Sequence, residues 1–208
     1  MPNRSVATLP PLLLIALLLV QCAWREPDAE EGAKVGAKTA RKAESQGLLN
    51  VQEASPDIRV DIRYATRMNV TQKRLYPPNM PAYLTVDTSR RLARAQAELR
   101  QKGYSLKVWD AYRPPRAHMA LWKAAPDSTY VVKPSPTSWS RHTLGLAVDV
   151  TLVDRNGQEV RMPTEFDAFT PAASSRYIGS DPVIRKNLQI LQTAMRNAGF
   201  STIPSEWW

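Results

Sequence analysis

The segment GLAVDVTLV at residues 145–153 constrains the fold more than any other stretch of the chain. Val148, Val150 and Leu152 alternate with the residues between them, and this period of two is typical of a strand within a sheet. Asp149 lies in the middle of this apolar strand. Because burying a carboxylate is unfavourable unless it is paired or binds a cation, the fold must bring a partner to Asp149.

The rest of the ordered chain alternates between strand-like and helix-like segments. Period-two or apolar runs predict further strands, and apolar stripes that end at Gly or begin at Pro predict helices. Together these segments predict an α+β fold with a mainly antiparallel sheet and flanking helices. The expected strands are 57–64, 104–113, 145–153 and 200–208, the expected helices are 88–102, 114–125 and 182–198, and a proline-rich loop is expected at 75–84.

The first 50 residues differ in composition from the remainder. Arg4 precedes an apolar run at residues 9–23 that is too short for an ordinary membrane span, which predicts a secretory signal over residues 1–22. Residues 23–50 are poor in large apolar groups, as is typical of a flexible linker. The predicted organisation is a signal, a linker and one domain over residues 51–208 of an exported, periplasmic or envelope-associated protein.

Cys22, the only cysteine, ends the apolar run in the sequence LLLVQC, which resembles a bacterial lipobox. Gln21 stands where a small residue is usual, so two outcomes stay open: lipidation of Cys22 with anchoring to the membrane, or ordinary signal cleavage that removes it. In either case no cysteine remains for a disulfide, so the stability must come from the packed core. The 43% content of hydrophobic residues is normal for such a core.

The net charge of +9 does not indicate a nucleic-acid partner. The basic residues form no cluster interleaved with aromatic residues, which nucleic-acid binding would require. An exported basic protein is instead expected to meet anionic polymers of the envelope.

The chain has two histidines, and their surroundings differ. His118 falls inside a predicted helix, where an ordinary helical or surface histidine is the simpler interpretation. His142 lies in SWSRHTLG, a turn that leads directly into the strand of Asp149. A histidine nitrogen and a carboxylate oxygen suit Zn²⁺, whose catalytic sites use three protein ligands and an open position for water. A His142–Asp149 hydrogen bond that only fixes the turn is the alternative.

Five motifs between residue 55 and Trp208 together resemble the zinc D,D-peptidases, and in particular the VanX-type D-alanyl-D-alanine dipeptidases. The stretch SRHTLGLAVDVTL is similar to the Ser-x-His-x-x-Gly-x-Ala-x-Asp signature of the whole group. All five motifs follow the family's order, so the set is far more specific than one motif, and it implies a hedgehog/D,D-peptidase-like fold. The motifs are IRYATRMNVT (62–71), VWDAYRPPRA (108–117), SRHTLGLAVDVTL (140–152), MPTEFDAF (162–169) and GFSTIPSEWW (199–208).

The resemblance implies catalytic roles for four residues. His142 and Asp149 take the positions of the first two zinc ligands, and Glu206 takes that of the catalytic base. Arg113 takes the position of an arginine that stabilises charge on the tetrahedral oxygen. The zinc would lower the pKa of its water, whose proton Glu206 would accept and return to the leaving amine. A simple ion pair between Arg113 and Asp110 is the alternative.

Three more residues match substrate contacts of the family. Asp167 and Ser140 would hold the free ammonium of the substrate, and Tyr64 is a further contact. An ammonium contact would favour a dipeptide, because a chain extended at that end has no charged amine to place. Two alternatives stay open: Asp167 could cap a turn, and Tyr64 could belong to the core.

The family's third zinc ligand is a histidine directly after Glu-Trp-Trp, at a position beyond Trp208. His118 precedes the signature motif and does not match that position. The resemblance therefore predicts a sequence truncated at its C-terminal end. The terminal carboxylate of Trp208 is the less favoured alternative for the third ligand.

The leading hypothesis is zinc-dependent hydrolysis of the D-Ala-D-Ala dipeptide in the bacterial cell envelope. A D,D-carboxypeptidase that trims peptidoglycan stem peptides is a close alternative. An inactive module that binds wall peptides is a different class, which the missing third ligand favours. A purely structural lipoprotein would leave the five motifs unexplained.

Overall fold

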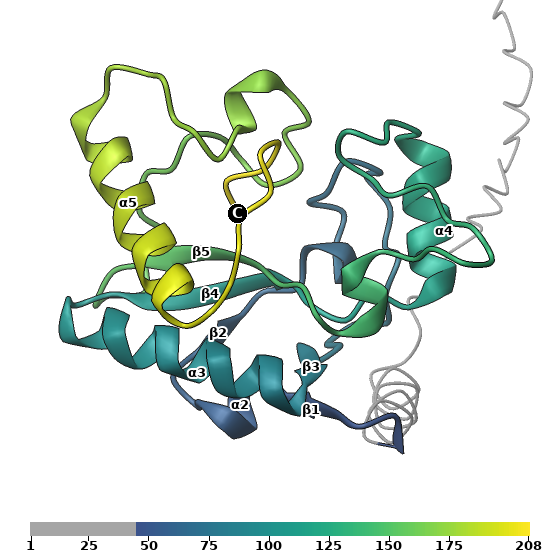
Figure 1. Ribbon diagram of the computed structural model, residues 1–208, viewed down its shortest axis with the longest axis horizontal. Helices are drawn as coiled ribbons and strands as arrows, with labels where there is room; N and C mark the ends of the chain where they lie inside the picture. The colour runs from purple at the N-terminus through teal and green to yellow at the C-terminus, as the bar shows by residue number, and fades with distance from the viewer. Residues whose placement is uncertain (1–44) are drawn as a thin grey trace, which may run out of the picture.

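The computed structural model describes residues 45–208 (Figure 1). The predicted signal, Cys22 and most of the predicted linker lie outside these residues. Within residues 45–208, none of the helices combines the length and the apolar character that crossing a membrane requires.

The strands form two small sheets. β1 (Leu48–Asn50) pairs antiparallel with β3 (Tyr83–Thr85). In the second sheet, β4 (Ser105–Asp110) lies between β2 (Arg59–Val60), which runs parallel to it, and β5 (Asp149–Val153), which runs antiparallel. The pairing is mainly antiparallel and helices flank the sheets, so the predicted α+β class is confirmed.

The helices begin where the sequence supplies caps. The side chain of Thr85 accepts a hydrogen bond from the backbone of Thr88, and that of Asp181 accepts bonds from Val183 and Ile184. In Figure 1, α3 and α5 lie together beside the larger sheet, and α4 lies apart at its other end. The helices are α2 (Val51–Ala54), α3 (Val86–Gln101), α4 (Pro115–Ala124) and α5 (Pro182–Asn197), with short 3₁₀ turns η1 (Arg63–Ala65), η2 (Arg141–Leu144) and η3 (Pro171–Ala173).

Order begins earlier than predicted. β1 falls within residues 23–50, which composition had indicated as a linker, and Leu48 is buried against β3. The apolar residues that start this strand are too few to alter the average composition of the region. β3 likewise lies at the end of the expected proline-rich loop, where the sequence predicted no strand.

Two predicted strands differ in the structure. Between residues 57 and 64 only Arg59 and Val60 pair with β4, because the chain then turns into η1. Ile58, Ile62 and Tyr64 are buried, and Val60 is partly buried. The predicted strand at 200–208 is wrong: Ile203 and Glu206 form one isolated bridge. Pro204 cannot donate to a ladder, and its carbonyl accepts bonds from Ser174 and Ser175 instead.

An aromatic cluster lies under the site. The ring of Phe166 lies 5.6 Å from that of Tyr64, 5.4 Å from that of Trp109 and 5.7 Å from that of Trp208, as centroid distances. Trp207 packs edge-on against Trp109 at 5.7 Å. This cluster joins β4, the MPTEFDAF segment and the C-terminal residues into one core, and the site is built on it.

Candidate active site

Asp110, the last residue of β4, is the centre of a buried hydrogen-bond network. Its Oδ1 accepts a 2.6 Å bond from the hydroxyl of Tyr76, and its Oδ2 accepts bonds of 2.9 and 2.8 Å from Nε and Nη2 of Arg113. Nδ1 of His142 lies 3.4 Å from the same Oδ2. A fully buried carboxylate with these partners orients both Arg113 and His142.

His142 is fixed through its Nδ1 side. Nδ1 lies 2.9 Å from the carbonyl oxygen of Ala111, which can only accept a hydrogen bond, so Nδ1 carries a proton. In the neutral imidazole Nε2 then bears the lone pair, and Nε2 lies 3.4 Å from Oδ1 of Asp149. The side chain of Ser140 accepts a bond from the backbone of His142 and thereby fixes η2. A metal-binding histidine needs this arrangement, with its outer nitrogen held by the protein.

Asp149 begins β5 and is buried, with His142 beside one oxygen and Arg113 Nη2 3.8 Å from the other. Burial opposes a charge on His142, but the carboxylates of Asp149 and Asp110 together outweigh this effect and raise the pKa of His142. The pair therefore favours a positive charge between the two side chains, either a proton or a metal ion.

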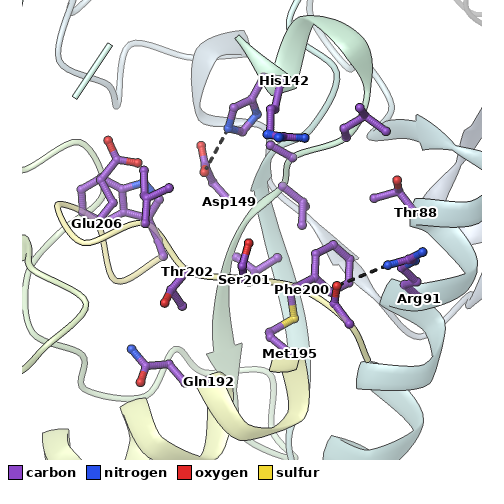
Figure 2. A pocket seen from close by; sticks show the side chains of 18 of the residues that line it. Thr88, Arg91, His142, Asp149, Gln192, Met195, Phe200, Ser201, Thr202 and Glu206 are labelled. Atoms are coloured by element: carbon purple, nitrogen blue, oxygen red, sulfur yellow. Dashed lines mark hydrogen bonds and ion pairs between the residues drawn. The ribbon is translucent and has the colours of Figure 1, made fainter. Parts of the chain in front are cut away.

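Glu206 lies on the same side of the cavity as His142 and Asp149 (Figure 2). Burial and the Asp149 carboxylate raise the pKa of Glu206 to about 8, against the opposite effect of His142 and Arg113. The next two residues hold it in place, because Trp207 and Trp208 are buried and Trp207 Nε1 donates a 2.9 Å bond to Thr164. A carboxyl group with a pKa near neutral can both accept and return a proton.

Arg113 forms the ion pair that the sequence offered as the alternative to a catalytic role. It pairs with Asp110, and it also lies in the site, near Asp149. Its Cζ lies 4.9 Å from the ring centroid of Tyr64, so the guanidinium rests on that ring. Tyr64 is likewise both a buried core residue and a neighbour of the site.

Asp167 is held in an unusual conformation next to Tyr64. Its φ is 57°, in the left-handed region that side chains disfavour. Oδ1 accepts a 3.0 Å bond from the Tyr64 hydroxyl, and Oδ2 accepts a 3.1 Å bond from the backbone of Val70. Burial raises the pKa of Asp167 to about 7. The side chain bonds back toward Tyr64 and Val70, so its predicted alternative as a cap of the following turn is wrong.

A cavity of about 470 Å³ lies beside the metal-binding candidates. His142, Asp149 and Glu206 line one part of it, and Figure 2 shows Thr88 and Arg91 of α3 and Gln192 and Met195 of α5 around the remainder. The other predicted site residues do not line this cavity; they are Tyr64, Arg113, Ser140 and Asp167.

His118 is fully buried in α4, so the predicted position in a helix is confirmed and the surface alternative is wrong. Its Nε2 lies 2.8 Å from the carbonyl oxygen of Val132. This contact ties α4 to the segment that leads to Ser140.

The geometry of His142 and Asp149 fits a metal ion. Two ligands at roughly 2.1 Å from a tetrahedral zinc lie about 3.4 Å apart, and the facing atoms of this pair are 3.4 Å apart. Asp110 lies in the same cluster, whose ligand atoms are all within 4.8 Å of one another. Since both oxygens of Asp110 already accept strong bonds, we assign it the role of orienting His142.

The sequence alone did not predict this role of Asp110. From the sequence, Asp110 was expected only as a possible ion-pair partner of Arg113. Its bond from Tyr76 and its contact with His142 involve residues far along the chain, so the local sequence did not indicate them. The signal available was an acidic residue at the end of an apolar strand, which required partners.

The comparisons with known proteins agree on one family. A profile described as D-ala-D-ala dipeptidase matches residues 44–208. The chain is 33% identical over 161 residues to a D-alanyl-D-alanine dipeptidase of Escherichia coli, covering 77% of this chain and 82% of the relative. It is 29% identical over 181 residues to a D-alanyl-D-alanine dipeptidase of Enterococcus faecium, covering 78% and 89%. The chain therefore belongs to the D-Ala-D-Ala dipeptidase family of metallopeptidases.

Proposed function

We propose that this protein is a zinc-dependent dipeptidase that hydrolyses D-Ala-D-Ala. The observation that carries the proposal is the gathering of His142, Asp149 and Glu206 around one cavity in a chain of this family. The two relatives described above are named for the same substrate. Zinc is the proposed metal because imidazole and carboxylate are ligands that catalytic zinc sites use.

In the proposed mechanism, the side chains of the site divide the work. His142 and Asp149 would hold the metal ion, which would polarise the substrate's carbonyl group and lower the pKa of a bound water. Glu206 accepts the proton of the attacking water and gives it to the leaving amine. Arg113, fixed by two bonds to Asp110, presents positive charge to the oxygen that becomes negative.

Asp167 and Ser140 are the proposed binding groups for the substrate's ammonium. Each oxygen of Asp167 accepts one hydrogen bond within the protein, and a carboxylate oxygen can accept a second. The bond from Tyr64 and the bond from Val70 fix the direction of the carboxylate. This contact would give the enzyme its preference for a free dipeptide.

The raised pKa of Asp167 predicts a pH dependence. We expect kcat/KM for D-Ala-D-Ala to fall as the pH drops below about 7, because only the carboxylate form pairs with an ammonium. Asp167→Asn should weaken this dependence, because only the contribution of Glu206, whose pKa is about 8, then remains, and it should raise KM about 10- to 100-fold, the scale of a hydrogen bond to a charged group. The measurement is a pH profile of kcat/KM for both proteins, and identical profiles would contradict the role of Asp167.

Replacement of Arg113 tests the stabilisation of charge. Arg113→Lys should lower kcat about 100- to 1,000-fold, because lysine keeps a charge for Asp110 but cannot reproduce the planar, two-point contact. Steady-state kinetics on D-Ala-D-Ala measures this, and the melting temperature shows whether the fold is kept. A folded variant with unchanged kcat would remove Arg113 from the mechanism.

The experiment that tests the proposed function compares two substrates. We expect kcat/KM for D-Ala-D-Ala to exceed that for N-acetyl-D-Ala-D-Ala by at least about 10- to 100-fold, since acetylation removes the charge that Asp167 binds. The opposite preference would favour the carboxypeptidase, which acts on acylated peptides, and would contradict the dipeptidase.

Location in the bacterial envelope is part of the same proposal. It rests on the apolar run before Cys22 and on a substrate that belongs to the cell wall. Fractionation of cells that express the full chain should recover the protein outside the cytoplasm.

A further inference from the structure

Tyr130 and Phe169 stack face to face, with ring centroids 4.8 Å apart and an angle of 8° between the ring planes. Tyr130 belongs to the segment between α4 and η2, and Phe169 to the segment between β5 and η3. In Figure 1 these two segments face each other above the larger sheet. The stack therefore connects two parts of the chain that each carry residues of the site.

The segment of Tyr130 is firmly held. Val131 is buried in the core, and the carbonyl of Val132 bonds to the ring of His118 in α4. The backbone of Tyr130 donates a 3.1 Å bond to the carbonyl of Asp127. Tyr130 thus offers a fixed surface against which another ring can be placed.

The segment of Phe169 carries Asp167. The backbone N–H of Phe169 donates a 2.8 Å bond to the carbonyl of Asp167, so the position of Phe169 and the backbone of Asp167 are linked. Asp167 has a φ of 57°, and a side-chain-bearing residue keeps such a conformation only where the surroundings enforce it. Tyr64 and Val70 hold the carboxylate, and Tyr130 holds the ring of Phe169, two residues further along the chain.

We propose that Tyr130 is a positioning residue for the ammonium-binding site: by stacking on Phe169 it keeps Asp167 in its left-handed conformation and its carboxylate correctly aimed. The inference rests on the proposed function, because it assumes that Asp167 binds the substrate's ammonium. Both rings are partly buried and pack against the edge of the core. Tyr130 acts through Asp167, and its loss should affect only substrates with a free amine.

The test uses three variants of the full chain. Tyr130→Leu keeps an apolar side chain but removes the stack, Tyr130→Phe keeps the stack, and Tyr104→Leu is the control, since Tyr104 is also a partly buried tyrosine packed on the core. Tyr130→Leu should raise KM for D-Ala-D-Ala about 3- to 10-fold, the scale of one aromatic pair, with little change in kcat. KM for N-acetyl-D-Ala-D-Ala should stay unchanged, and Tyr130→Phe should restore the wild-type values.

The outcomes separate this inference from the proposed function. If the wild type prefers the free amine but Tyr130→Leu shows equal losses on both substrates, or none, the positioning role is overturned and the dipeptidase stands. If the wild type shows no preference, both fail. Calorimetric binding of the two peptides to Glu206→Gln, with and without Tyr130→Leu, gives the same comparison without turnover. Phe169→Leu, with the same expected loss, serves if Tyr130→Leu does not fold.

Discussion

Glu206→Gln should lower kcat for D-Ala-D-Ala about 100- to 10,000-fold, the usual contribution of general acid–base catalysis, with a small change in KM. Glutamine has nearly the same size and shape as glutamate, so Trp207 should stay in place, but its amide cannot accept a proton. Steady-state kinetics with matched metal content measures the effect. Glu165→Gln is the control, because Glu165 is an exposed carboxylate of the MPTEFDAF segment, and its kcat should equal that of the wild type.

We also expect Glu206→Gln to change how the stability of the metal-free protein depends on pH. Burial raises the pKa of Glu206 from 4.5 to about 8, so the folded protein binds a proton that the unfolded chain releases. The stability of the wild type should therefore fall as the pH rises from about 4.5 to about 8, and Glu206→Gln should lose this part of the fall.

In the kinetic test, a Glu206→Gln protein that keeps more than about a tenth of the wild-type kcat would remove Glu206 as the base.

His142→Gln should abolish stoichiometric metal binding and, with it, hydrolysis. Removing a residue that only hydrogen-bonds to a metal ligand typically lowers metal affinity about 10- to 100-fold. The loss in His142→Gln should be larger, because Nε2 is a direct ligand in the proposed site. Metal content by elemental analysis, followed by kcat/KM, measures both effects.

His118→Gln is the matched control for that variant, since the chain has only these two histidines. The amide of glutamine can still donate to the carbonyl of Val132, which His118 contacts now. We expect full metal content and near wild-type activity. Metal retained in His142→Gln but lost in His118→Gln would exchange the roles assigned to the two residues.

The long helices were predictable because each buries a stripe of its own local sequence. In α3, Leu92, Ala95 and Leu99 are fully buried, as their spacing predicted. β1 and β3 could not be predicted in this way, since each has only three residues and pairs with the other across a long stretch of chain. Pairing across a long loop leaves no periodic signal in a single sequence.

In the candidate site too, the local sequence predicted some residues, and others depend on contacts between distant segments. His142 and Asp149 could be placed together because a short turn leads directly into one strand, and the structure places their facing atoms 3.4 Å apart. Asp110 and the stack of Tyr130 on Phe169 depend on contacts between distant segments. The sequence could indicate that a buried acid needs partners, but only the fold identifies them.

The most direct test of the account is the release of D-alanine from D-Ala-D-Ala by the purified protein, before chelation, after chelation and after Zn²⁺ is added back. The account predicts release that disappears with the chelator and returns with Zn²⁺. Release that the chelator leaves unchanged would contradict the metal site. Binding of the dipeptide without any release, at full zinc content, would contradict the dipeptidase and leave a module that binds wall peptides.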